Sequence, residues 1–278
     1  ALRSGEPQVV ADAIAEHYLP RAAGGALPQS PAGIALALAD RLDSIVGLFA
    51  AGMQPSGSAD PYGLRRAAQG IVQILLGHAL SVDLRPLIEW AALGFTRELG
   101  EQFVTEQSRA AVLDFIAGRL RGVLAETFRH DVVEAIIARQ AHDPYRAQAY
   151  AGQLARWVAR ADWQPILDAY ARCVRITRSQ DTRYTLRPRG FAEPAEKALY
   201  NAYRKAATAV GEDTDLDGFL ATFAEMVPAI TTFFAPAEEG GVLVMHEDRA
   251  IRENRLALLQ HTVALGEGFA DFSQMEGF

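Results

Sequence analysis

Apolar residues recur at steps of three and four along most of this chain, and that spacing is the period of an α-helix. The clearest case follows Ser30 and Pro31, which suit the N-cap and the first helical position. The apolar stripe behind them consists of Ile34, Leu38, Leu42, Ile45 and Phe49. Alternating β-branched residues are absent except for a short run at 241–245. The sequence therefore predicts an all-α fold.

Helical periods cover almost the whole chain. A further helix is expected after Asp60 and Pro61, which repeat the same start signal. Others are predicted over 8–18, 84–99, 107–128, 131–140, 144–160, 163–179, 193–210, 215–234 and 248–273. Two stretches without a helical period, 21–30 and 180–190, lie between them. We detect no internal repeat, and a length of 278 residues suggests one large or two ordinary domains.

Composition and charge exclude several classes of protein. No run of about 18 apolar residues is free of charges or breaks, and the N-terminal residues lack a signal-peptide core. A single cysteine, Cys173, allows neither an internal disulfide nor a cysteine metal cluster. The formal net charge of −7 argues against a general polyanion binder, although a local basic patch can exist in an acidic chain. The sequence therefore predicts a soluble, cytoplasmic protein.

Glycines recur at every seventh position from 63 to 77 in the helix expected after Asp60. Gly63, Gly70 and Gly77 each cost about 1 kcal/mol relative to alanine inside a helix. Close approach of another helix would explain them, and the alternative is that they are exposed and simply tolerated. Arg65 and Arg66 point about 100° apart, because they are neighbours on a helix. At most one of the two therefore faces a packed neighbour, and the other faces solvent or a polyanion.

Most candidates for catalysis have a simpler explanation. The pair His-Asp occurs at 130–131 and at 142–143, as in metal phosphohydrolases of the HD type, but both pairs lie at expected helix starts, where capping and the helix dipole favour aspartate. Asp40 and Asp43 share a helix face without a histidine nearby, so we favour a solvated acidic face over a cation site. Gly-rich phosphate loops and the motifs G-x-S-x-G, H-E-x-x-H and C-x-x-C are missing. We therefore expect no catalytic residue, no metal and no cofactor.

The strongest local signal is basic. Between residues 172 and 189 one acid, Asp181, stands against six arginines: Arg172, Arg175, Arg178, Arg183, Arg187 and Arg189. The first three are spaced by three and form one edge of a helix. Tyr184 adds an aromatic ring that could stack on a base. This pattern alone favours RNA binding no more than a solvated helix end, where arginines meet the negative pole of the helix dipole.

Several segments resemble a known family in the same order. The N-terminal ones read "EHYLPRAAGGALPQS", "ALADRLDSIVGLF" and "DPYGLRRAA", and the C-terminal ones read "YARCVRITRS", "EPAEKALYNAYRKA" and "VLVMHEDRAIRENRLALLQ". Together they resemble the beta subunits of bacterial heterotetrameric glycyl-tRNA synthetases, with a weak resemblance over 85–160. The C-terminal segments, at 163–179, 193–205 and 243–259, are also similar to the α-helical anticodon-binding domain of arginyl-tRNA synthetases.

The resemblance implies a domain organisation. It predicts the C-terminal part of an HD-like helical domain over 1–130, a helical linker over 131–160, and an anticodon-binding helical bundle (DALR-like) over 161–278. Asp40 matches the last aspartate of the H…HD…D pattern. The histidine members of that pattern would lie before Ala1, so the resemblance implies a C-terminal fragment that holds no metal and has no hydrolase activity.

The resemblance also implies a role in the ATP-dependent attachment of glycine to its tRNA. Catalysis would belong to the alpha subunit, so this chain alone is expected to be non-catalytic. Its expected partners are tRNA-Gly and the alpha subunit, with no membrane and no DNA. The expected tRNA contacts are the six arginines above, Tyr184, and Arg65 or Arg66.

Three residues are expected to be structural. Asp60 and Pro61 start a helix, and Arg255 lies four residues after Ile251 and three before Leu258, close to a buried stripe. The alternatives to the synthetase role are a non-catalytic helical scaffold, an RNA-binding module related to the arginyl-tRNA synthetase domain, and an HD-type nucleotide hydrolase, whose histidine ligands this sequence lacks.

Overall fold

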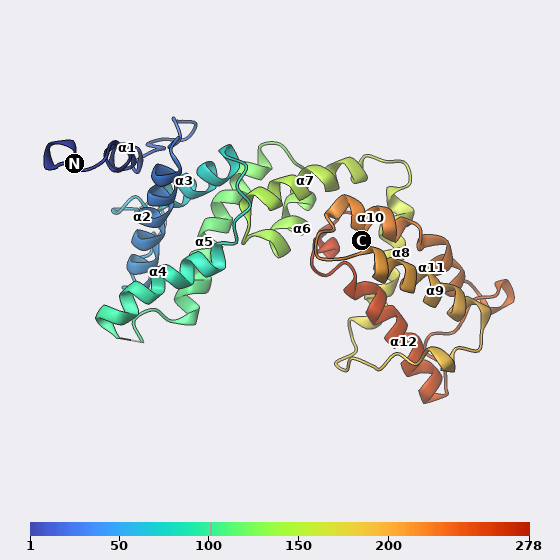
Figure 1. The fold of residues 1–278 in the computed structure, drawn as a ribbon. Helices are drawn as coiled ribbons and strands as arrows, with labels where there is room; N and C mark the ends of the chain where they lie inside the picture. Colours follow the sequence, from blue (N-terminus) through green and yellow to red (C-terminus); the bar gives the residue numbers. More distant parts are fainter. Residues whose placement is uncertain (101) are drawn as a thin grey trace. The chain divides into compact units, whose positions relative to one another are not determined.

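The structure is a computed structural model that describes residues 1–100 and 102–278. Figure 1 shows helices joined by loops along the whole chain. Within the described residues no strand forms, and the run at 241–245 lies in a loop and a turn. The prediction of an all-α fold is therefore confirmed. None of the described helices combines the length and the hydropathy that a membrane crossing needs.

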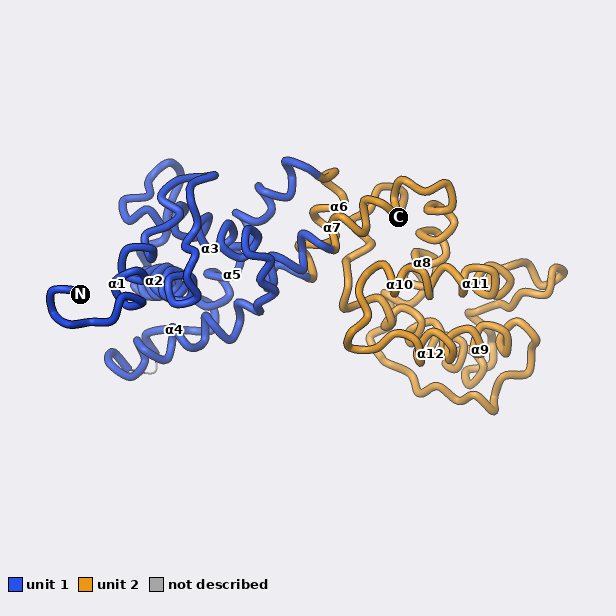
Figure 2. The backbone as a smooth tube through the Cα atoms, turned by 45° about the horizontal axis from the view of Figure 1, so that its top comes forward, with its two compact units in different colours: residues 1–127, 140–149 blue, residues 128–139, 150–278 orange. Residues whose placement is uncertain are grey.

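The chain divides into two compact units (Figure 2). Unit 1 contains residues 1–127 and 140–149, and unit 2 contains residues 128–139 and 150–278. The residues predicted as a helical linker, 131–160, carry helices α6 (His130–Gln140) and α7 (Pro144–Val158). Their residues are shared between the two units.

Unit 1 is built around one central helix. Its helices are α1 (Gln8–Glu16), α2 (Pro31–Ala50), α3 (Leu64–Gly77), α4 (Leu84–Leu99) and α5 (Glu106–Ala125). Helix α2 contacts each of the other four, since its apolar stripe is wide enough to bury residues on several sides. Its start is as predicted: Pro31 is the first helical residue, and the Ser30 side chain accepts a hydrogen bond from the Gly33 N–H at 3.0 Å.

The start of α3 differs from the prediction. The helix begins at Leu64 rather than at Pro61, because Gly63 adopts the left-handed conformation at φ 69° and interrupts the helical backbone. Asp60 still caps the helix across this turn. Its carboxylate oxygens accept from the N–H groups of Leu64 at 2.8 Å and Arg65 at 3.0 Å. Pro61 lies in the turn, outside the helix.

The glycines of α3 allow close approach at two of the three predicted positions. A Cβ atom on Gly70 would lie 2.5 Å from Nε of Arg41, which belongs to α2. A Cβ atom on Gly77 would clash with the Leu27 side chain, which comes from a loop rather than from a helix. Gly63 lies outside the helix, so its place in a helix interior was wrongly predicted.

Unit 2 contains an aromatic core between its helices. They are α8 (Trp163–Thr177), α9 (Pro194–Ala209), α10 (Leu216–Ala224), α11 (Val227–Phe233) and α12 (Arg249–Ala264), with parts of α6 and α7. Helix α8 packs against α11 and α12. The rings of Phe219 and Phe269 are stacked at 4.8 Å, and Tyr170 meets Phe223 and Phe272 edge to face.

Two predicted helices of unit 2 are shorter than expected. The helix predicted over 215–234 is broken between Ala224 and Val227, because Pro228 has no N–H to continue the preceding helix and instead lies at the start of α11. The helix predicted over 248–273 ends at Ala264. Gly266 and Gly268 follow, as is common after a helix end.

Candidate nucleic-acid interface

The exposed edge of α8 carries Arg172 and Arg175, and Arg178 continues this edge as the residue that caps the C-terminal end of the helix. The opposite face of the helix, which includes Cys173 and Thr177, is buried against the core of unit 2. Because the three arginines are spaced by three residues, they turn away from the core together. Burial raises the pKa of the Cys173 thiol to about 12, so this cysteine is an inert core residue.

These three arginines have no anionic partner within the described residues. None of their guanidinium groups donates a hydrogen bond or forms an ion pair. Arg175 lies over the ring of Phe278, 5.6 Å from its centroid. The edge of α8 therefore presents three positive charges that the protein does not neutralise itself.

The segment from 180 to 190 follows α8 and is irregular except for a short 3-10 turn at Pro188–Gly190. Two amides of α12 fix its backbone. Gln260 accepts from the Tyr184 N–H at 3.0 Å and donates to the Thr182 carbonyl at 2.8 Å. Asn254 accepts from the Arg187 N–H at 2.7 Å and donates to its carbonyl at 3.0 Å. The loop is thus held in one conformation without belonging to a helix.

Exposed arginines also line this segment. Arg187 and Arg189 make no side-chain hydrogen bond or ion pair within the described residues, and Arg183 lies 3.4 Å from the Glu267 carboxylate. That pair is solvent-exposed and contributes little to stability. Tyr184 is half-buried, and its hydroxyl donates to Gln180 Oε1 at 3.2 Å. One side of the predicted stacking ring is therefore packed against the protein.

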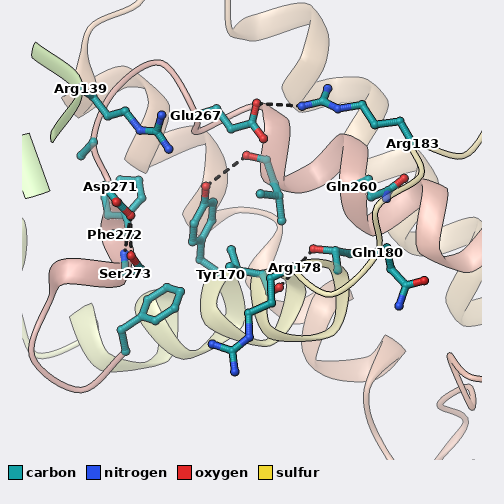
Figure 3. Close-up of a pocket in the computed structure, with 15 residues that line it drawn as sticks. Arg139, Tyr170, Arg178, Gln180, Arg183, Gln260, Glu267, Asp271, Phe272 and Ser273 are labelled. Carbon is teal, nitrogen blue, oxygen red and sulfur yellow. Dashed lines mark hydrogen bonds and ion pairs between the residues drawn. The ribbon is translucent and has the colours of Figure 1, made fainter.

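A cavity of about 320 Å³ opens between the end of α8 and the C-terminal segment. Figure 3 shows Arg183 reaching toward Glu267 at its rim, with Asp271 bound to Ser273 on another side. Arg178 and Arg139 also line it. Tyr170 closes the base and donates to the Val263 carbonyl at 3.1 Å, and burial raises its pKa. With three arginines and two carboxylates, the cavity suits a ligand that carries both an anionic group and hydrogen-bond donors.

Arg255 is buried rather than part of this surface. Its Nε donates to Oε1 of Glu196 at 2.6 Å, and its Nη1 donates to the Leu243 carbonyl at 2.7 Å. The other oxygen of Glu196 accepts from the N–H groups of Ala192 and Glu193, both at 2.9 Å. Arg255 thereby joins α12 to the start of α9, which is a structural arrangement.

Arg65 and Arg66 belong to unit 1 and differ from each other. Arg65 donates to the carbonyls of Ala59 at 3.2 Å and Gly57 at 2.7 Å, so it closes the loop before α3. Arg66 is exposed, and its guanidinium has no hydrogen-bond partner within the described residues.

The four aspartates considered for metal binding either accept hydrogen bonds from backbone N–H groups at helix starts or lie exposed on α2. Asp143 caps α7 by accepting from the Arg146 N–H at 3.0 Å, and Asp131 accepts from the Val132 N–H at 2.9 Å. Asp40 and Asp43 are both exposed. Partial burial, Asp40 and Glu98 raise the pKa of Asp43. Among the described residues, no three His, Cys, Asp or Glu side chains gather where they could hold a metal ion.

Comparison with known proteins decides the family. The model of a family described as "Glycyl-tRNA synthetase beta subunit" matches residues 1–138. The glycine--tRNA ligase beta subunit of Myxococcus xanthus is 37% identical to this chain over 289 aligned residues, which include 99% of the chain. The chain belongs to the glycyl-tRNA synthetase beta subunit family. The beta subunit of Geotalea daltonii is 38% identical over 278 residues, and that of Clostridioides difficile is 36% identical over 261 residues.

The beta-subunit resemblance extends further than the sequence motifs indicated. The alignments to the Myxococcus and Geotalea proteins include residues 85–160, where the motifs are weak. The chain spans about 40% of the length of these curated relatives.

Sequence reasoning did not identify the side chains that support the basic surface. Asn254 and Gln260 lie on a helix whose sequence shows mainly a buried apolar stripe. Nothing in their spacing indicates that they bind the loop at 180–190. Glu196 had a weak signal, because a glutamate three residues after Glu193 fits a capping box. Its contact with Arg255 spans 59 positions of sequence and could not be read from local spacing.

Proposed function

We propose that this chain is a tRNA-binding portion of a glycyl-tRNA synthetase beta subunit. In this proposal it works in the cytoplasm, binds tRNA-Gly through unit 2, and supports the attachment of glycine that an alpha subunit catalyses with ATP. The chain itself is non-catalytic and holds no metal or cofactor. Its partners are tRNA-Gly and the alpha subunit, with no membrane and no DNA. Family membership supports this assignment. It is also supported by the C-terminal segments at 163–179, 193–205 and 243–259, whose sequences resemble the anticodon-binding domain of arginyl-tRNA synthetases.

The observation that carries the proposal is the unpaired basic edge of α8. Arginines on a protein surface commonly find carboxylates, as Arg129, Arg156 and Arg160 do in this same unit. Arg172, Arg175 and Arg178 do not, although the chain has a net charge of −7. A phosphate backbone supplies the missing negative charge and releases its counterions on binding, which favours the complex.

The loop at 180–190 extends this edge. Its backbone is already fixed by Gln260 and Asn254, so Arg187 and Arg189 lose little backbone entropy when they bind a phosphate. Phosphate contacts position an RNA without reading its sequence. We therefore assign these arginines to the backbone of the anticodon region, with the cavity beside Arg178 as the place where an unpaired base is received.

The salt dependence of tRNA binding tests this proposal. Each phosphate contact contributes about −0.7 to −0.9 to the slope of log affinity against log salt. Changing Arg172, Arg175 and Arg178 to alanine should flatten that slope by roughly two to three for tRNA-Gly. The matched control changes Arg129, Arg156 and Arg160, which are ion-paired, to alanine. It removes the same charge and should keep the parental slope.

Several outcomes contradict the proposal. Equal slopes for the α8 variant and the parent chain, or an equal loss in the control, would place the RNA elsewhere or reduce its binding to net charge. A helical scaffold that binds only proteins predicts no salt-dependent tRNA binding at all. Formation of glycyl-tRNA by this chain alone, with ATP, glycine and tRNA, would contradict the non-catalytic assignment.

A further inference from the structure

Unit 1 has an open groove of about 550 Å³ that the proposed function does not use. One wall is the segment from His17 to Arg21, which follows α1. The other wall is the segment from Tyr62 to Ala67, at the start of α3. Asp40 and Ser44 of α2 form the floor between them.

Two tyrosines stand exposed in this groove. Tyr18 is 62% exposed and Tyr62 is 54% exposed. The ring of His17 lies 3.8 Å from that of Tyr18, centroid to centroid, and is itself fixed by donating from Nδ1 to the Ile14 carbonyl at 2.6 Å. Tyr18 is therefore supported on one face by a held ring, and the phenol groups of both tyrosines have no hydrogen-bond partner within the described residues.

Hydrogen bonds hold the backbone of both walls in place. Under the first wall, the buried guanidinium of Arg41 donates to the carbonyls of His17 and Leu19, both at 2.8 Å, and to that of Pro20 at 3.3 Å. Under the second, Asp60 caps α3 from across the turn at Gly63. The exposed rings thus stand on fixed backbone, which lowers the entropy lost when a ligand binds.

The charges of the groove complement a nucleotide. Arg21 and Arg66 are exposed cations whose guanidinium groups have no hydrogen-bond or ion-pair partner within the described residues. Asp40 is an exposed carboxylate that forms no ion pair there, and an ionised carboxylate only accepts hydrogen bonds. Aromatic rings interleaved with arginines are the usual surface for unpaired nucleic acid, because every base has a face that stacks.

We propose that this groove binds an unpaired nucleotide of an RNA strand. The base stacks on Tyr18 or Tyr62, and the flanking phosphates contact Arg21 and Arg66. Asp40 accepts from the exocyclic amino group of the base, so the groove prefers cytosine to uracil. This site lies wholly within unit 1, and it does not depend on the arginines of α8.

The test uses the full chain with Arg172, Arg175 and Arg178 changed to alanine, so that binding at α8 is weakened. The probes are fluorescently labelled single-stranded pentamers of cytidine or uridine, and the measurement is fluorescence anisotropy. At least one of Tyr18→Ala and Tyr62→Ala should weaken cytidine binding by roughly fivefold or more, because the base–aromatic stack is lost. Tyr18→Phe and Tyr62→Phe keep the ring and should bind within about twofold of the parent.

Three further variants sharpen the test. Trp90→Ala removes an exposed aromatic of unit 1 that does not line the groove, and it should bind as the parent does. Arg21→Ala with Arg66→Ala should flatten the salt slope by about 1.4, as expected for two contacts to a single strand. Asp40→Asn should narrow the preference for cytidine over uridine.

The proposal is overturned if the tyrosine-to-alanine variants bind as tightly as the parent, or if Trp90→Ala loses as much. Absence of measurable binding to either pentamer overturns it as well. If an equal concentration of cytidine monophosphate displaces the pentamer, the ligand of the groove is a free nucleotide rather than an RNA strand, which also contradicts the proposal. Each readout is independent of the slope measured for tRNA-Gly, so the failure of one proposal is distinguishable from the failure of the other.

Discussion

Within residues 1–100 and 102–278, each unit contains one well-buried arginine, and the two have different hydrogen-bond partners. Arg41 in unit 1 is 7% exposed, and Arg255 in unit 2 is 5% exposed. Arg41 donates to four backbone carbonyls, and the two shortest of these hydrogen bonds are 2.8 Å long. Arg255 donates to one carbonyl and to the buried carboxylate of Glu196. The first organises a loop, and the second joins two helices.

The difference shows what a buried cation needs. Burial lowers the pKa of Arg41, while Asp40 acts in the opposite direction. An arginine ordinarily stays charged at physiological pH despite such a shift. Carbonyl dipoles are therefore enough to hold a buried guanidinium in unit 1. In unit 2 a second charge is buried with the first, so that each depends on the other.

Removal of Arg255 should have the largest effect of the substitutions considered. Arg255→Met leaves the Glu196 carboxylate buried without its cation, and breaking a buried pair in this way costs about 3–5 kcal/mol of unfolding free energy. Hydrogen exchange of peptides from α9 and α12 reports the loss within unit 2. The salt slope of tRNA binding should stay at the parental value, since Arg255 does not reach the surface.

A second substitution separates two causes of this instability, the lost packing of Arg255 and the unpaired charge of Glu196. Glu196→Gln in the Arg255→Met background removes the unpaired carboxylate while its amide oxygen can still accept from the N–H groups of Ala192 and Glu193. We expect the double variant to be more stable than Arg255→Met alone. If the two variants are equally unstable, the cost comes from packing, and the contrast with Arg41 is lost.

Removal of Arg41 should have a smaller effect. Arg41→Met leaves carbonyls without a donor but strands no charge, and an unsatisfied buried polar group costs about 1–3 kcal/mol. The loop at 17–20 should exchange amide hydrogens faster, while α9 and α12 keep their protection. A loss as large as that of Arg255→Met would show that the carbonyls bind the cation as strongly as a carboxylate does.

Gly70 offers a sharper test of how firmly Arg41 is held. Gly70→Ala places a methyl group 2.5 Å from Nε of Arg41, and crowding of a packed site costs about 1–3 kcal/mol. In an Arg41→Ala background the space is free, and the same change should stabilise by about 1 kcal/mol through helix propensity. A reversal of sign between the two backgrounds, measured by chemical denaturation, supports a fixed guanidinium. The same sign in both backgrounds indicates that Arg41 moves aside.

These two arginines also show how far the sequence alone leads. The periodicity predicted the all-α fold, and the position of Arg255 beside an apolar stripe predicted a packed residue. Arg41 was not singled out, because its partners are backbone carbonyls of residues 17 to 20, which carry no side-chain signal. Contacts that span many residues, such as Asn254 to the loop at Arg187, are likewise fixed by tertiary packing rather than by local pattern.

Helix ends were also predicted correctly where the signal is local, and were misplaced where it is not. The start of α2 was predicted because Ser30 and Pro31 act locally. The start of α3 was misplaced because Gly63 takes a left-handed conformation between the cap and the helix, and a glycine permits but does not require that conformation. Arg172, Arg175 and Arg178 were predicted to form one edge of a helix because they are spaced by three residues. The groove of Tyr18 and Tyr62, by contrast, needs two loops far apart in sequence.

The smallest expected effect concerns a carboxylate at the surface of unit 1, in contrast to the buried Glu196 of unit 2. Glu16 accepts from the Ser30 hydroxyl at 2.6 Å and from the Ser30 N–H at 2.9 Å, which ties the end of α1 to the start of α2. These hydrogen bonds, the hydroxyl first, lower the pKa of Glu16 below its ordinary value of 4.5.

A carboxylate whose pKa is lower in the folded state stabilises the fold above its unfolded pKa, and this contribution is lost as the pH falls through the folded pKa. Glu16→Gln should therefore lower the melting temperature slightly near neutral pH, and the difference from the parent chain should shrink below about pH 4.5. Thermal melting between about pH 3 and pH 7 measures it. Because Glu16 is only half-buried, the solvent can replace its partners, whereas the buried Glu196 has no such substitute. A difference that stays constant down to the lowest pH would mean that the shape of the Glu16 side chain, rather than its charge, joins the two helices.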